Sequence, residues 1–182
     1  MNRIIFVLIV ALTNSSFASQ SKPDTGKEAR TDFEGVWVLD KSKSKVAPNR
    51  EDAQSMIWLV QQSDKSLSVE PIIRGTNGRM NVAIKVVWRL DGTERSDEVV
   101  QSDTRRHSTT KAKWLDNGKV LEVTRHVKTT VEGKETTENS IARFELADGG
   151  KTLIVNENVN QGKEERRYVL YKSQYIDQLI RQ

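Results

Sequence analysis

The sequence predicts an all-β protein, in which an antiparallel up-and-down meander of about eight to ten strands closes into a barrel and a short helix ends the chain. Apolar and polar residues alternate with a period of two along most of the chain, which is typical of strands with one buried face. Short turn signals separate these runs, mostly at intervals of roughly 12 to 16 residues, and leave no room for crossover helices. The turn signals are Ser63–Ser66, Gly75–Gly78, Asp91-Gly92, Asn117-Gly118, Glu132-Gly133, Asp148–Gly150 and Gln161-Gly162.

Residues 1–18 have the pattern of a signal peptide. A positive charge at Arg3 precedes the apolar run Ile4 to Leu12, and Ser16-Phe17-Ala18 supplies the small residues of a cleavage site. The alternative, a membrane anchor, is disfavoured because this run is about half of the ~20 residues that span a bilayer. Residues 19–31 carry Pro, Gly and mixed charge without apolar periodicity, so we expect a flexible leader there.

The composition limits the cellular compartments and the kinds of chemistry to be expected. None of the 182 residues is a cysteine, which excludes disulfides, cysteine zinc sites and thiol nucleophiles. An exported chain of this kind suits a bacterial periplasm or growth medium. The formal charge of +4 comes from interspersed charges. The one basic patch, Arg105-Arg106 with Lys111 and Lys113, lacks interleaved aromatic residues, so we expect a solvated strand face and no nucleic-acid partner.

Four runs predict strands most clearly. Their apolar faces carry Phe33, Gly35, Trp37 and Leu39; Val82, Ile84, Val86, Trp88 and Leu90; Leu121, Val123 and Val127; and Ala142, Phe144 and Leu146. We expect these faces to point inward and the charged faces to point to solvent. A membrane barrel would need the opposite pattern, and we expect no membrane span after signal cleavage.

Closing the meander into a barrel would remove both sheet edges. The barrel domain is predicted over residues 32–172. The polar connection 41–54 is expected to cover or flank the mouth of the barrel. Residues 173–182 place Tyr175, Ile176, Leu179 and Ile180 on one side of a short helix. This helix is expected to dock on the barrel, with a partner-binding helix as the alternative.

The segment from Phe33 to Ser44 resembles the first strand of lipocalin-like proteins of the calycin group, which carries a Gly-x-Trp motif matched here by Gly35 and Trp37. The fuller pattern is similar to a family of exported bacterial lipocalin-like domains of uncharacterised function. Segments 114–121 and 146–153 are also similar to that family. The resemblance implies that Trp37 closes one end of the barrel and that a basic residue of a late strand, Arg166 or Arg167, packs across its ring.

Three tryptophans are candidates for contact with a ligand. Trp58, Trp88 and Trp114 lie in separate predicted strands, and aromatic side chains commonly line pockets for small apolar molecules. The alternative is that each tryptophan fills the core.

Two arginines are candidates for orienting a polar group of the ligand. Arg166 and Tyr168 share a strand face and could hold a carboxylate, as a similar arrangement does in fatty-acid-binding proteins; the alternative places Arg166 in solvent. Arg125 interrupts the apolar face of its strand, so it either needs an anionic partner or marks the strand's exit from the core.

No catalytic, metal-binding or cofactor motif is present. His107 and His126 have no ligand spacing and are expected on the surface. The sequence therefore predicts an exported barrel that binds a small apolar or amphipathic ligand without catalysis. The alternative is a barrel with a filled core that acts through its surface as an envelope interaction or inhibitor module, with an unknown protein partner.

Overall fold

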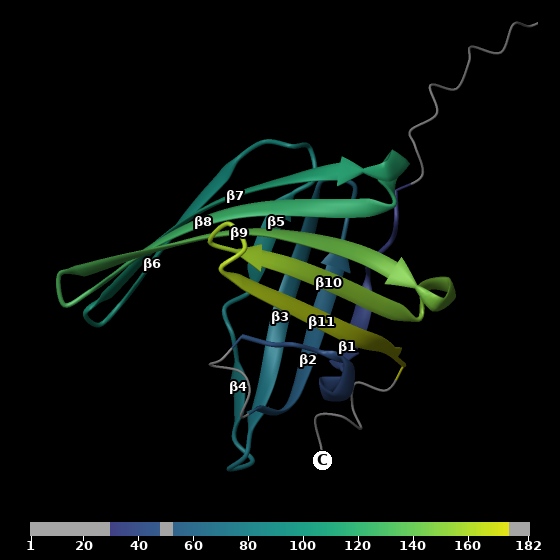
Figure 1. Ribbon diagram of the computed structural model, residues 1–182, viewed down its shortest axis with the longest axis horizontal. Coiled ribbons are helices and arrows are strands. Elements are labelled where there is room, and N and C mark those ends of the chain that lie inside the picture. Colours follow the sequence, from purple (N-terminus) through teal and green to yellow (C-terminus); the bar gives the residue numbers. More distant parts are fainter. Residues whose placement is uncertain (1–29, 48–52, 175–182) are drawn as a thin grey trace, which may run out of the picture.

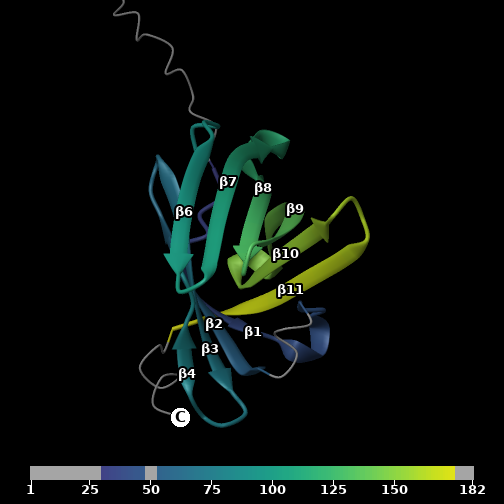
Figure 2. The same cartoon turned by 90° about the vertical axis from the view of Figure 1, so that its left-hand side faces the viewer.

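The computed structural model describes residues 30–47 and 53–174. Within these ranges the strands form one 11-stranded antiparallel sheet that coils around a single interior (Figures 1 and 2). The strands are β1 (Gly35–Leu39), β2 (Ala53–Gln62), β3 (Ser66–Gly75), β4 (Met80–Val82), β5 (Val86–Arg89), β6 (Arg95–Gln101), β7 (Thr104–Leu115), β8 (Val120–Val131), β9 (Lys134–Ala147), β10 (Thr152–Val159) and β11 (Glu164–Ser173). Three short 3-10 turns accompany them: η1 (Lys41–Lys43), η3 (Asp116–Gly118) and η4 (Asp148–Gly150).

The prediction of an all-β antiparallel meander is confirmed, but the predicted closure into a barrel is wrong. The sheet order is β4-β3-β2-β1-β11-β10-β9-β8-β7-β6, with β5 also paired to β3. The first and last strands therefore pair with each other, and the ladder is interrupted between β5 and β6, which are consecutive in the chain. Across this gap β5 contacts β7 without a strand ladder.

The break in the ladder coincides with a local turn at residues 91–93. The Asp91-Gly92 signal was expected to make a hairpin, but the Asp91 carboxylate accepts hydrogen bonds from the backbone N–H and the hydroxyl of Thr93, at 2.9 and 2.6 Å. In this Asx-type turn the Asp91 side chain supplies the hydrogen bonds of the loop. The following strand, β6, pairs with β7. The other six turn signals each join two paired strands.

The run from Val82 to Leu90 was predicted as one strand with a buried face. Instead β4 and β5 pair with different parts of β3 and are separated by residues 83–85. Val82 and Ile84 are 63% and 56% exposed, whereas Trp88 and Leu90 are buried. The predicted inward residues of the first half, Val82 and Ile84, therefore lie outside the core, although Ala83 between them packs against it.

Three predicted segments fall mainly outside the described residues: the signal peptide 1–18, the leader 19–31 and the helix 173–182. Within the described part, Ser173 is the last residue of β11 and so does not begin a helix. Thr31, at the end of the predicted leader, is fixed in place, because its N–H and hydroxyl donate to the carbonyl oxygens of Gly118 and Lys119 at 2.8 and 3.1 Å.

The end of the sheet near the chain's first described residues is closed by side chains; we call it the closed end. Phe33 and Trp37 are fully buried there, and the Trp37 indole N–H donates to the Phe33 carbonyl oxygen at 2.9 Å. The Phe33 ring stacks on Trp114, with centroids 5.9 Å apart. The amide of Gln62 also holds this segment, accepting from Phe33 N–H and donating to the Thr31 carbonyl oxygen.

The expected cap on Trp37 is a different residue from those predicted. Lys172 of β11, and neither Arg166 nor Arg167, places its ammonium over the Trp37 ring, 5.4 Å from the centroid. Strand β1 pairs Trp37 directly with Lys172, whereas Arg166 lies six residues away along β11. A Cβ on Gly35 would come within 2.8 Å of the Lys172 Cε. Gly35 therefore leaves room for the lysine stem to cross the tryptophan.

Apolar residues also occupy part of the outer face, where charge was expected. Val38, Ile57 and Ile72 pair across β1, β2 and β3 and are buried, with Val36 and Leu59 packed against them. The clean division into an apolar inner and a charged outer face therefore does not hold for these three strands.

Another outer-face group on β7, β8 and β9 consists of a buried glutamate and two exposed basic residues. The Glu122 side chain is 7% exposed and lies 2.9 Å from both Lys113 Nζ and Arg143 Nε. The hydrogen bond from Lys113, followed by that from Arg143, lowers the pKa of Glu122 below its ordinary value. These residues lie opposite one another in the ladder, so the cluster locks the register of three strands.

We expect Gly35→Ala to lower the free energy of unfolding by about 2–3 kcal/mol, because a φ of +146° is strained for any residue with a Cβ and the added Cβ would also displace the Lys172 side chain. The matched control Gly78→Ala also has positive φ but meets no neighbouring atom, and it should lose only about 1 kcal/mol. Urea denaturation followed by tryptophan fluorescence measures both values. Equal losses would contradict the clash.

We expect Glu122→Gln to lower the free energy of unfolding by about 1–2 kcal/mol at neutral pH. Because the folded pKa of Glu122 is lowered, its stabilisation is present above the unfolded pKa of ~4.3 and disappears as the pH falls through the folded value. The difference between the two proteins should therefore vanish in acid. In the exposed Lys128–Glu135 pair, Glu135→Gln should change stability by less than about 0.5 kcal/mol at any pH.

Candidate ligand-binding interior

The inner face of the sheet changes from apolar to charged along the strands. On β10 and β11 the inward pair Val155–Tyr168 is followed, two residues further on, by Glu157–Arg166. On β8 Leu121 and Val123 are followed by Arg125. Side chains alternate between the two faces of a strand with a period of two. Inward residues that pair across neighbouring strands therefore lie at the same height in the interior. An apolar and aromatic level therefore lies toward the closed end, and a charged level lies beyond it.

Arg166 is the centre of the charged level. Its side chain is 11% exposed and contacts Glu164, Glu157 and Glu138 at 2.7, 3.3 and 3.2 Å. The hydrogen bond to Glu164, and then the charges of Glu157 and Glu138, raise the pKa of Arg166 above its ordinary value. Arg166 thus points inward on the same face as Tyr168, as one alternative predicted, but its guanidinium already binds carboxylates of the protein.

Arg125 also faces inward and has a partner. Its guanidinium Nη2 lies 2.6 Å from Glu138 Oε1 and 3.9 Å from Glu157, and its side chain is 24% exposed. The strand does not leave the core at this point, because Val127 beyond it is buried. Glu138 joins the two candidate arginines, since its other oxygen contacts Arg166. The structure therefore brings Arg125 and Arg166 into one network.

The three candidate tryptophans lie in the apolar level. Trp58 and Trp88 are buried, and Trp114 packs against the same core. Trp58 contacts the Tyr168 ring and Trp88 contacts Phe144, each with centroids 5.3 Å apart. All three indole Nε1 atoms are buried without a hydrogen-bond partner in the structure. Trp37, by contrast, donates to Phe33.

Sequence reasoning missed Arg106, which it assigned to an exposed basic patch. Arg105, His107, Lys111 and Lys113 are exposed, but Arg106 is half-buried on the opposite, inner face of β7. The signal that could have found it is its parity with the buried Thr110 and Ala112. The patch is therefore divided between two faces of the strand.

The two histidines were expected on the surface, and both are exposed. His126 Nδ1 forms a hydrogen bond with Asn139 Oδ1 on the outer face. In the part of the chain that the structure describes, no three His, Cys, Asp or Glu side chains form a group that could hold a metal ion.

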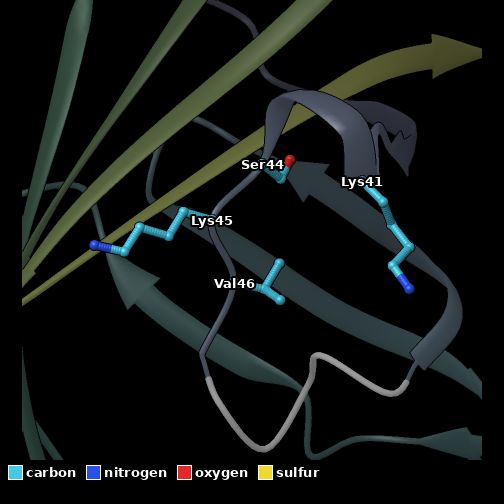
Figure 3. A pocket seen from close by; sticks show the side chains of 4 residues that line it. All are labelled: Lys41, Ser44, Lys45 and Val46. Carbon is cyan, nitrogen blue, oxygen red and sulfur yellow. The ribbon is translucent and has the colours of Figure 1, made fainter.

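A pocket beside η1 is lined by Lys41, Ser44, Lys45 and Val46 (Figure 3). The two ammonium groups point away from each other in Figure 3, and the Lys41 ammonium donates to the Ala53 carbonyl oxygen at 2.7 Å. Lys45 exchanges two backbone hydrogen bonds with Arg167. The segment thus runs beside the charged level, but its cations do not converge on one ligand.

Comparison with known proteins gives no independent assignment. No family model matches the chain, and no curated protein matches it. Among residues 30–47 and 53–174, no helix is long and apolar enough to cross a membrane. The case for a function therefore rests on the interior just described.

We expect Arg166→Gln to lower the free energy of unfolding by about 3 kcal/mol, because it leaves three carboxylates without their shared cation. The double variant Glu157→Gln/Arg166→Gln should lose less than the sum of the single losses, since one unpaired charge is removed. The control Arg167→Gln changes the exposed neighbour on the outer face, whose side chain donates to Asn156, and should cost less than about 0.5 kcal/mol. Additive losses in urea denaturation would contradict the network.

Proposed function

We propose that this protein is an exported, lipocalin-like carrier that binds a small amphipathic molecule inside its coiled sheet and performs no catalysis on it. The observation that carries the proposal is the set of three buried indole N–H groups, on Trp58, Trp88 and Trp114, that have no hydrogen-bond partner among residues 30–47 and 53–174. A ligand with an acceptor group would satisfy one or more of them.

The energetic argument concerns desolvation. A buried donor without an acceptor costs about 1–3 kcal/mol, and such groups are rare in native proteins unless water or a ligand meets them. Three of them in one core, from three separate strands, are more than local packing requires. The same donors would bind a carbonyl, ether or hydroxyl oxygen of a ligand with little competition from water.

The two levels of the interior match an amphipathic ligand. The aromatic level offers area for an apolar body, and the charged level offers polar contacts for the other end. The Gly35–Trp37–Lys172 arrangement at the closed end supports the resemblance to lipocalin-like proteins. The signal-like pattern of residues 1–18 supports export.

A second candidate function is binding of a protein partner through the surface. Both free edges of the sheet carry exposed apolar side chains, Val82 on β4 and Val100 on β6, at 63% and 62% exposed. Unpaired edges can accept an added strand. This function would need no interior ligand, so the experiment below separates the two.

We expect the protein to bind prodan, an uncharged naphthalene with a ketone acceptor, more tightly than N-phenylnaphthylamine, which lacks a carbonyl group. Trp88→Phe removes one unpaired donor and should weaken prodan about three- to tenfold. Fluorescence titration, with energy transfer from tryptophan to the probe, measures both affinities.

The control Ile141→Thr changes an exposed residue of β9 and should leave both affinities unchanged. Absence of binding by either probe, together with no small molecule retained in native mass spectrometry, would favour the surface function instead.

A further inference from the structure

We infer that Arg106 binds the anionic head group of the ligand, so that the ligand is an amphipathic anion. This inference rests on the proposed function and names the ligand's chemical class. It concerns an arginine on the inner face that the carboxylates of the charged level leave unpaired.

The placement of Arg106 follows from strand parity and register. On β7 Thr104, Arg106, Ser108, Thr110 and Ala112 are buried or half-buried and the charged residues between them are exposed. Arg106 pairs with Val99 of β6 and with Thr129 of β8. Neither neighbour can neutralise a guanidinium. The Arg106 side chain therefore lies on the inner face, and the residues paired with it on both neighbouring strands are not acidic.

The other inward arginines of β6–β11 each have a carboxylate. Arg95 makes a bidentate contact with Asp97 at 2.7 and 2.8 Å, Arg125 binds Glu138, and Arg166 binds three acids. The Arg106 guanidinium, by contrast, has no hydrogen bond or ion pair with any residue in the described ranges. Of the inward carboxylates, Glu138, Glu157 and Glu164 lie on β9, β10 and β11. Asp97 on β6 is bound by Arg95, so Arg106 on β7 is left without an acid partner.

The electrostatics agree with this geometry. Burial, and then the positive charge of Arg125, lower the pKa of Arg106, while Glu138 only partly opposes them. A bound anion would stabilise the charged Arg106 guanidinium in two ways. It would replace the hydration lost by burial, and it would offset the repulsion from Arg125. A planar guanidinium suits carboxylate, sulfonate and phosphate oxygens alike, through paired hydrogen bonds.

The position is also right for a head group. The charged level lies beyond the aromatic level along β8, β10 and β11. Arg106 pairs with Thr129, two inward positions beyond Arg125 on β8, so a ligand with its apolar end toward the aromatic level would direct its head toward Arg106. The ligand would then enter with its apolar end first. The pocket beside η1 offers no comparable site, since its lysines diverge (Figure 3).

The test uses a matched pair of probes, N-phenylnaphthylamine and anilinonaphthalene sulfonate, which share their aromatic body and differ in the sulfonate. We expect the wild-type protein to bind the sulfonate about tenfold more tightly, and Arg106→Gln to abolish that preference while changing the uncharged probe less than about twofold. Arg106→Lys should keep part of the preference. The control Arg105→Gln alters the adjacent arginine, which is exposed and faces outward, and should keep all of it.

The outcomes separate the inference from the proposed function. If the uncharged probe binds but the sulfonate has no advantage, or if Arg105→Gln and Arg106→Gln act alike, the inference is wrong and the proposed function stands. If neither probe binds, both are wrong. Salt provides a test without substitution, because added sodium chloride should weaken the sulfonate and leave the uncharged probe unchanged. An equal response of both probes to salt would overturn the inference.

Discussion

The burial of Trp37 is the constraint on which the rest of the fold depends. Burying an indole costs least when its N–H is bonded and its face is covered, and the chain meets both needs for Trp37. Phe33 supplies the carbonyl oxygen, Lys172 covers the ring, and Gly35 leaves room for the lysine. Satisfying Trp37 therefore requires β1 to lie beside β11, which brings the two ends of the domain together.

From that end the interior is organised in levels. Antiparallel register places residues of one kind opposite one another on adjacent strands, so a change from apolar to charged residues along each strand becomes a change of environment along the whole interior. Charged side chains on an inner face are costly unless paired, and the network around Glu138 and Arg166 meets that requirement on β8 to β11. It does not extend to β7, where Arg106 remains without a carboxylate among the described residues.

The sheet retains unpaired edge strands. Pairing of β1 with β11 joins the first and last strands, but the sheet still ends at β4 and β5 on one side and at β6 on the other. Contact between β5 and β7 holds these parts together by side-chain packing without a ladder. An interior bounded in this way has fewer backbone hydrogen bonds on one side than a fully closed barrel.

The sequence by itself determined the all-β class, six of the seven hairpin turns it signalled, and the inward tryptophans, because period-two patterning and turn dipeptides act through neighbouring residues. It could not determine the broken ladder, the choice of Lys172 over Arg166 and Arg167, or the partners of the inward arginines. Those outcomes depend on register between strands that are distant in the chain. The contrast between Arg166 and Arg106 is the clearest case: both are arginines on inner faces, yet only the packing of β8 to β11 decides that one is surrounded by carboxylates and the other is not.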